Sequence, residues 1–303
     1  VARKMAECAV ENYKEIPEAF SLAENDGGGH CECPNCRALD VEEWQPGKPA
    51  LADRLAVLAN RVKETIGDRA PGMVLGYYGY HQGELPSVKT KLAPGIILGD
   101  VHNSYDLFYH QKEARAYQLR ILKGWREKCA QVYLITYFHG MTWWSLPFSA
   151  TDALTELIKT AAQYPSSEGI YVGMTYRHDA FGTQGNEYYL AAALMWDPRR
   201  STEAILAEYY EAAYGPAAAP IKEYFERIGK SYGAWAGTQA KVAADECHDD
   251  SWVVPTYEPI SRRCDELIQK AAAAAGDGDA ALQRRVKIVA DGWEWTKLQT
   301  DTI

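Results

Sequence analysis

Two carboxylates separated by one residue, Glu24 and Asp26, follow a short apolar run and precede three glycines. Residues i and i+2 of an extended segment point to the same side, so both carboxylates could face one pocket. Paired acids hydrolyse glycosidic bonds: one protonates the leaving oxygen, and the other acts on the anomeric centre or positions the substrate's acetamide. The alternative is a turn, in which Asp26 only accepts hydrogen bonds from nearby backbone.

A second acid with the same spacing is Asp100, which lies two residues before His102 at the end of another apolar run. Asp100 could supply the partner carboxylate, although an aspartate often simply ends a strand. Tyrosine, tryptophan and histidine side chains after the predicted strands could bind a sugar, because they combine an apolar face with a polar edge. The predicted pocket residues are Tyr78, Tyr80, His81, His102, Asn103, Tyr137, His139, Trp143, Trp144, Tyr176 and His178.

Three cysteines, Cys31, Cys33 and Cys36, follow the paired acids. Cysteine is a preferred zinc ligand, so the cluster could hold a structural zinc ion that stiffens the loop after Asp26. A strong zinc prediction needs a second group of ligands, and none follows, so a disulfide or free thiols are equally open. Hydrolysis by paired acids requires no cofactor.

Composition limits the classes of partner. The chain has 303 residues, of which 47% are hydrophobic, and a net charge of −9 without a long basic run. These values favour one large or two modest domains and argue against nucleic acid or an anionic membrane as a partner. Twenty tyrosines and nine tryptophans against six phenylalanines suit sugar binding, or alternatively the covering of helices.

Short apolar runs alternate with amphipathic helical patterns in residues 1–182, which is typical of a parallel sheet with covering helices. We expect strands at 19–23, 73–78, 96–99, 131–137 and 169–174. We expect one helix at 2–14, before the first strand. Between the strands we expect helices at 50–67, 107–128 and 151–163, the last capped by Thr151 or Ser149.

The polar residues follow the carboxyl ends of these strands, where a (β/α) barrel carries its active site. Five parallel strands are too few for a closed barrel, so we expect the C-terminal part of a TIM-type barrel in residues 1–182. An upstream barrel half or N-terminal domain would complete it, and a five-stranded open sheet is the alternative. Residues 183–303 are expected to form a helical C-terminal region.

Four segments together resemble a bacterial domain family of originally unknown function. They are Glu24–Gly27 running into Cys31–Leu39, Gly185–Leu190, Leu194–Pro198 and Tyr214–Ala218. The family is similar to glycoside-hydrolase-like TIM barrels such as α-glucuronidases, and some members are endo-β-N-acetylglucosaminidases acting on N-glycans. The resemblance covers roughly residues 15–230, and Asp26 matches a more regular acid of the family than Glu24 does.

The resemblance implies a glycoside hydrolase that cleaves an N-acetylglucosaminide or uronide bond in an oligosaccharide or polysaccharide. Asp26, Glu24 and Asp100 are the expected acids, and we expect a secreted or periplasmic protein. The alternatives are a non-catalytic carbohydrate-binding protein on a degenerate barrel and a zinc-dependent hydrolase.

Overall fold

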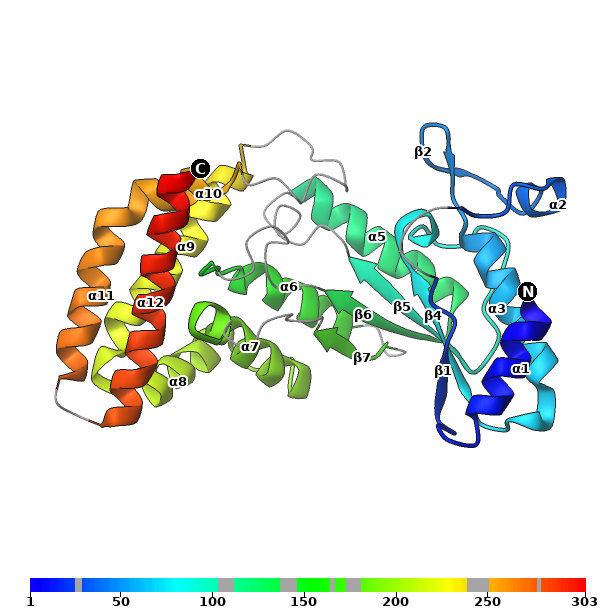
Figure 1. Cartoon of the computed structure of the whole chain (residues 1–303), viewed down its shortest axis with the longest axis horizontal. Helices are drawn as coiled ribbons and strands as arrows, with labels where there is room; N and C mark the ends of the chain where they lie inside the picture. Colours follow the sequence, from blue (N-terminus) through cyan, green and yellow to red (C-terminus); the bar gives the residue numbers. More distant parts are fainter. Residues whose placement is uncertain are drawn as a thin grey trace. The chain divides into compact units, whose positions relative to one another are not determined.

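The chain divides into two compact units in a computed structural model (Figure 1). The structure describes residues 1–24, 29–102, 112–136, 146–163, 167–172, 181–238, 251–276 and 279–303. The first unit consists of residues 1–103, 116–136 and 164–171, and the second of 104–115, 137–163 and 172–303.

A sheet with the strand order β1-β4-β5-β6-β7 organises the first unit. Pairing is parallel from β1 to β4, from β4 to β5 and from β5 to β6. The expected mixed α/β fold with a parallel sheet is therefore confirmed. The strands are β1 (Ala19–Ser21), β4 (Val74–Gly79), β5 (Ile96–His102), β6 (Gln131–Thr136) and β7 (Ser167–Val172).

Helices cover one face of this sheet. Along β4, buried and half-buried residues alternate, and Tyr77 on the buried side lies edge-on to Trp125 at 5.8 Å between ring centroids. Leu98 opposes Tyr77 on β5 and is also fully buried. Burial of these apolar side chains holds the strands in register. The helices of this unit are α1 (Ala2–Asn12), α3 (Ala52–Ile66) and α5 (Lys112–Lys128), and α1 packs on α3.

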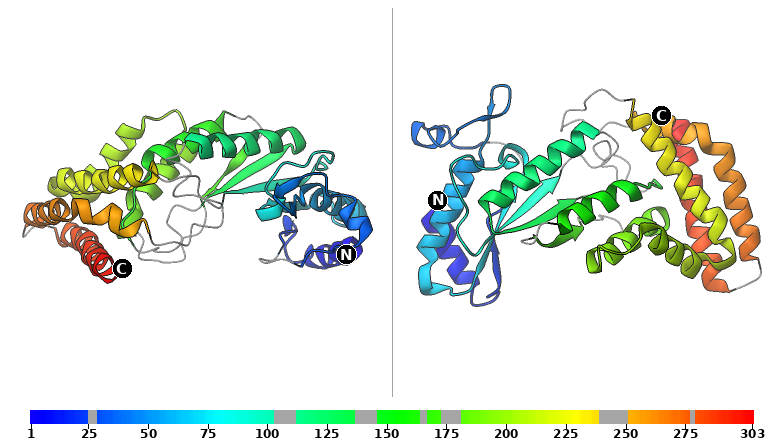
Figure 2. Two further views of the ribbon diagram at one scale, coloured as in Figure 1. Left: turned by 90° about the horizontal axis from the view of Figure 1, so that it is seen from above. Right: turned by 180° about the vertical axis from the view of Figure 1, so that it is seen from behind.

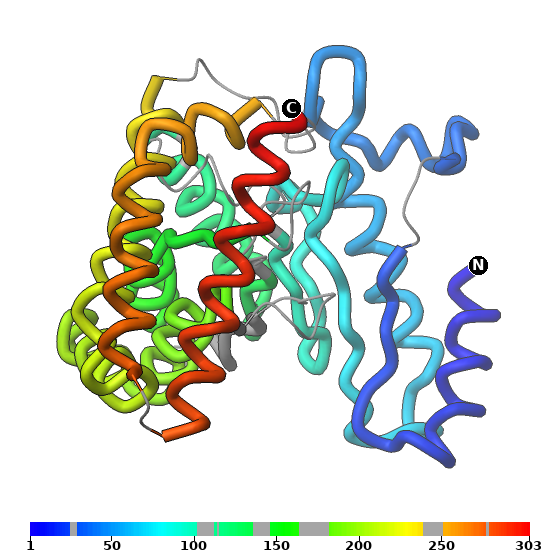
Figure 3. Tube along the Cα trace, turned by 60° about the vertical axis from the view of Figure 1, so that its left-hand side comes forward, coloured from blue at the N-terminus to red at the C-terminus, as the bar shows by residue number. Residues whose placement is uncertain are grey.

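Two small elements between β1 and α3 were not predicted from the sequence. They are the single-turn helix α2 (Pro34–Arg37) and an antiparallel hairpin of β2 (Glu43–Gln45) and β3 (Lys48–Pro49). Figure 3 shows the hairpin projecting as a narrow loop from the first unit. Arg54 of α3 binds this segment through both carboxylate oxygens of Asp40 and through the carbonyl oxygen of Cys31.

The second unit is helical, which confirms the expected helical C-terminal region. Its helices α9, α11 and α12 run side by side (Figure 2). Their core is rich in aromatic rings, among them Tyr224, Tyr257 and Trp293, which meet edge to face. Much of the chain's tyrosine and tryptophan is therefore used to cover helices. The helices are α6 (Thr151–Ala162), α7 (Phe181–Trp196), α8 (Thr202–Tyr214), α9 (Ala218–Ala236), α10 (Val253–Tyr257), α11 (Ser261–Ala275) and α12 (Ala280–Thr302).

The start of α6 differs from the expectation that Thr151 or Ser149 caps it. The N-cap is Ala150, which has no capping side chain, and its backbone N–H donates to Glu187 of α7. A buried carboxylate from another helix thus accepts the N–H of the N-cap residue itself, whereas a capping hydroxyl would have accepted an N–H of the first helical turn. None of the described helices has the length and apolar character needed to cross a bilayer.

Candidate functional site

Glu24 lies just beyond the carboxyl end of β1. The Leu22 N–H still donates to Gly76 of β4, at 2.7 Å, and the chain then leaves the sheet. The Glu24 side chain is 20% exposed, and its Oε2 is 3.6 Å from His30 Nε2. Within the described residues, this buried Oε2 has no hydrogen-bond partner. Burial raises the pKa of Glu24, and the nearby His30 partly lowers it.

Tyr77 of β4 is a buried residue of the first unit that lies within reach of the Glu24 charge. Burial raises the pKa of its hydroxyl strongly, and the negative charges of Glu24 and then Asp53 add to that effect. The hydroxyl has no hydrogen-bond partner among the residues that the structure describes. Asp53 is itself occupied, because its carboxylate accepts the backbone N–H groups of Val88, Lys89 and Thr90. Glu24 differs from Asp53 in that its buried Oε2 accepts no hydrogen bond from the part of the chain that the structure describes.

Half-buried rings follow the end of β4. Tyr80 and His81 lie 3.9 Å apart between ring centroids, and His81 has a φ of 46°, in the left-handed region. Trp44 of the hairpin meets His81 edge-on at 6.4 Å. The structure thus brings the predicted residues Tyr80 and His81 together and adds Trp44, which the sequence did not indicate. Tyr78 is half-buried on the opposite side of β4 from Tyr77.

Glu84 is a buried acid that the sequence did not indicate as a site residue. Its carboxylate accepts Trp44 Nε1 at 3.3 Å, and its backbone oxygen accepts Trp125 Nε1 at 2.8 Å. Burial is the main reason why the pKa of Tyr117 on α5 is raised. The negative charge of Glu84 and a hydrogen bond with Glu84 raise it further. Glu84 stands alone before Leu-Pro, and no motif surrounds it. Its position shortly after the Tyr80-His81 pair was the one sequence feature that could have indicated it.

Asp100 is fully buried near the carboxyl end of β5. In the parallel register it lies opposite Gly79, and strand alternation places it on the same face as Leu98, which the helices cover. Its charge reaches Tyr117, whose pKa it helps to raise. Asp100 therefore lies with Glu84 and Tyr117 beneath α5, inside the first unit.

Cys31, Cys33 and Cys36 form a compact cluster of thiols that could bind a metal. Their sulfur atoms all lie within 4.8 Å of one another, and all three are free cysteines. Hydrogen bonds lower the pKa of Cys33, first from the backbone of Cys36 and then from the other two thiols. Hydrogen bonds with the thiols of Cys33 and then Cys31 raise the pKa of Cys36 to about 11. Of these two thiols, Cys33 is therefore the one that ionises more readily.

Several predicted site residues lie outside the described residues, and His102 is described only as part of strand β5. Glu24 is the described member of the predicted acid pair. The predicted residues outside the description are Asp26, Asn103, Tyr137, His139, Trp143, Trp144, Tyr176 and His178.

Comparison with known proteins gives one family. The model of a domain of unknown function, DUF4838, matches residues 5–226. Neither a curated protein nor a solved structure matches the chain.

Proposed function

We propose that this chain, which belongs to the DUF4838 family, is a glycoside hydrolase acting on a complex glycan. Glu24 donates a proton to the leaving oxygen. The second acid, Asp26, acts on the anomeric centre or positions the acetamide of an N-acetylated sugar, because Asp100 is fully buried beneath α5. The substrate class that the sequence resemblance favours is an N-acetylglucosaminide or uronide in an oligosaccharide or polysaccharide.

The environment of Glu24 is the observation that carries this proposal. A general acid must hold its proton near the working pH, and burial raises the pKa of Glu24 in that direction. Its Oε2 lies 3.6 Å from His30 Nε2 but has no hydrogen-bond partner among the described residues, so this oxygen can carry the proton. Both properties are those of a proton donor rather than of a structural carboxylate.

The rings that follow β4 support a sugar as the ligand. Tyr80, His81 and Trp44 are half-buried and lie against one another. Such rings offer an apolar face to the C–H groups of a sugar and a polar edge to its hydroxyls. They belong to the same unit as Glu24.

The finer features of the expected architecture are part of the same proposal. We take the parallel sheet of the first unit to be part of a (β/α) barrel of a secreted or periplasmic protein, completed by upstream strands. The three clustered thiols would then hold a structural zinc ion next to the loop that carries Glu24. Zinc would fix the segment after Asp26 and take no part in bond cleavage.

Substitution of Glu24 by glutamine, assayed with paired substrates, tests the acid assignment. With a glycan whose leaving group is an unactivated sugar, we expect kcat/KM to fall about a hundredfold or more. With a dinitrophenyl glycoside of the same sugar, the fall should be much smaller, because that leaving group departs without protonation. The assay uses N-acetylglucosaminides and glucuronides. Glu18→Gln is the matched control, since Glu18 is an exposed acid just before β1.

Equal losses with both leaving groups would show that Glu24 is not the proton donor. The second candidate function, a glycan-binding protein without catalysis, is favoured by the burial of Asp100 beneath Tyr117. A chain that binds glycans by calorimetry and hydrolyses none of these substrates would establish that function and refute the enzymatic one.

A further inference from the structure

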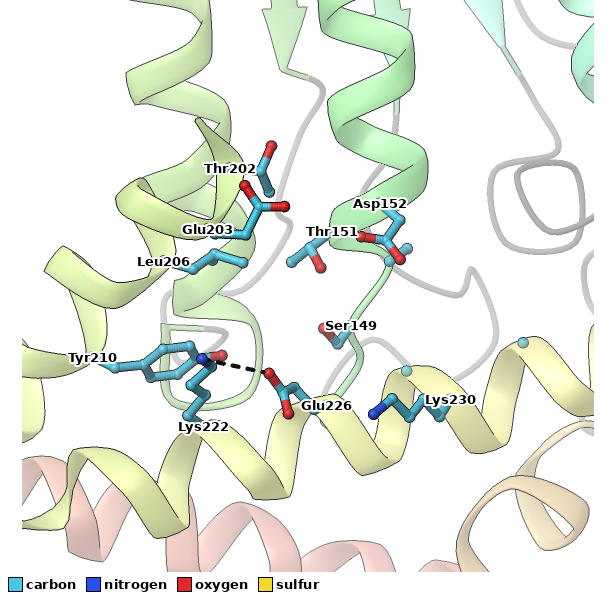
Figure 4. Close-up of a pocket in the computed structure, with 13 residues that line it drawn as sticks. Ser149, Thr151, Asp152, Thr202, Glu203, Leu206, Tyr210, Lys222, Glu226 and Lys230 are labelled. Atoms are coloured by element: carbon cyan, nitrogen blue, oxygen red, sulfur yellow. Dashed lines mark ion pairs between the residues drawn. The ribbon is translucent and has the colours of Figure 1, made fainter. Parts of the chain in front are cut away.

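A cavity of about 440 Å³ lies within the second unit, whereas the site built on β1 and β4 belongs to the first unit (Figure 4). The first turns of α6 and α8 and one face of α9 surround it. Its volume is within the range of small-molecule sites in proteins. Neither the family match nor the proposed hydrolase site uses these residues.

Close packing of α9 against the start of α6 shapes one wall. A Cβ atom added at Gly229 would lie 2.6 Å from the backbone oxygen of Ser149, so only glycine allows this approach. Lys222, Glu226 and Lys230 repeat at intervals of four residues and present one helix face to the cavity, as Figure 4 shows. The wall is therefore a fixed backbone surface that carries charged side chains.

Buried polar groups of α7 support the other side. Asn186 is fully buried, and its Nδ2 donates to Ser149 Oγ at 3.3 Å. Asn186 Oδ1 has no hydrogen-bond partner within the described part of the chain. Ser149 itself is only 6% exposed, and both Ser149 and Tyr210 line the cavity. Hydroxyl groups backed by buried polar side chains make a fixed hydrogen-bonding surface.

The charged side chains around the cavity are of both signs and nearly balance. Three carboxylates, of Asp152, Glu203 and Glu226, stand against the ammonium groups of Lys222 and Lys230. Asp152 and Glu203 lie in the first turns of α6 and α8. Their carboxylates already offset the partial positive charge of these helix N-termini, which would otherwise attract an anion. Among the described residues, only the three clustered thiols are close enough together to hold a metal ion.

We propose that this cavity binds a single neutral sugar unit. The hydroxyl groups of the sugar would donate hydrogen bonds to the carboxylates and accept them from the lysines and from Ser149. A neutral ligand with many hydroxyl groups can make these hydrogen bonds without adding an unpaired charge. The site is separate from the Glu24 site, so it stands whether or not the chain hydrolyses glycosides.

Methyl NMR of the full chain tests this assignment with glucose, galactose and N-acetylglucosamine as neutral probes. We expect at least one of them to shift the methyl signals of Thr151 and Thr202 in a saturable way, without moving Leu267 in the α11 core. Glucuronate and galacturonate should bind several-fold more weakly than the matching neutral sugar, because the cavity carries one net negative charge. The same is expected of alanine, a zwitterion without sugar hydroxyls.

Two substitutions locate the binding. Leu206→Trp fills the cavity and should abolish the shifts, whereas Glu211→Gln, on α8 outside the lining, should keep them. If Leu206→Trp does not fold, Ser149→Ala serves instead and should weaken binding about threefold to tenfold through loss of one hydrogen bond. Glu24→Gln should bind as the unchanged chain does. The proposal is overturned if no neutral sugar shifts these methyls, if both cavity variants bind normally, or if uronates or alanine bind as tightly.

Discussion

Burial and the nearby His30 together set the pH at which Glu24 can donate a proton. Burial raises its pKa, while His30, 3.6 Å away, lowers it. A proton donor works below its pKa, so the hydrolytic rate should fall as the pH rises through the pKa of Glu24. His30 therefore lowers the upper end of the active pH range.

His30→Ala is expected to raise the pKa of Glu24 further, because the opposing charge is removed and burial remains. The alkaline limb of the kcat/KM profile should move to higher pH, and the ¹³C signal of the Glu24 carboxyl group should titrate at higher pH. Lys4→Ala, which removes an exposed cation of α1 in the same unit, should leave both unchanged. A limb that stays in place or moves to lower pH would contradict the pairing.

At the residue level, spacing could predict which acids follow strands but not which way each one faces. Glu24 was found because it follows an apolar run. Glu84 was missed because its partners, Trp44 and Trp125, lie about 40 residues away on either side. Asp100 was found at a strand end, yet its burial beneath α5 depends on the strand register and the helix above it.

The segment between β1 and α3 owes its shape to a few tertiary contacts. Arg54 binds Asp40 and Cys31 from α3, and the three thiols gather beside single-turn α2. A helix of this length has little stability of its own. The sequence could indicate the cysteines. An element that is held by contacts with residues far along the chain has no periodic pattern of its own to detect. The longer helices and the parallel strands were predicted because each has an apolar pattern of its own.

Zinc binding by this segment is testable through its cysteines. The reduced chain should take up one zinc ion, bound by the thiolates of the three clustered cysteines. Cys33→Ser and Cys36→Ser should each abolish stoichiometric zinc measured by atomic emission, and should reduce hydrogen-exchange protection of residues 30–39. Cys8→Ser, which removes an exposed thiol on α1, should retain both. Zinc content that is zero in the unchanged chain, or equal in all variants, would rule the site out.

For the molecule as a whole, the apolar pattern of a helix could not predict which of the two hydrophobic cores the helix packs against. α6 lies before residue 182 in the chain, yet it belongs to the second unit, where Glu187 of α7 accepts the Ala150 N–H. Tyr257 of α10 likewise donates to Pro147, just before α6, at 2.7 Å. These contacts join residues far apart in sequence, so an amphipathic pattern predicts the helix and leaves its partner open.

Each unit has its own buried core, so the two should lose stability separately. Leu98 of β5 and Leu267 of α11 are both buried, in the first and second unit respectively. Leu→Ala at either position should cost about 2–5 kcal/mol by leaving a cavity. Calorimetry should then show two unfolding transitions, with Leu98→Ala lowering one and Leu267→Ala the other. Leu298→Ala, at a leucine that is 60% exposed, should leave both in place. A single transition lowered by both core substitutions would mean that the units unfold as one.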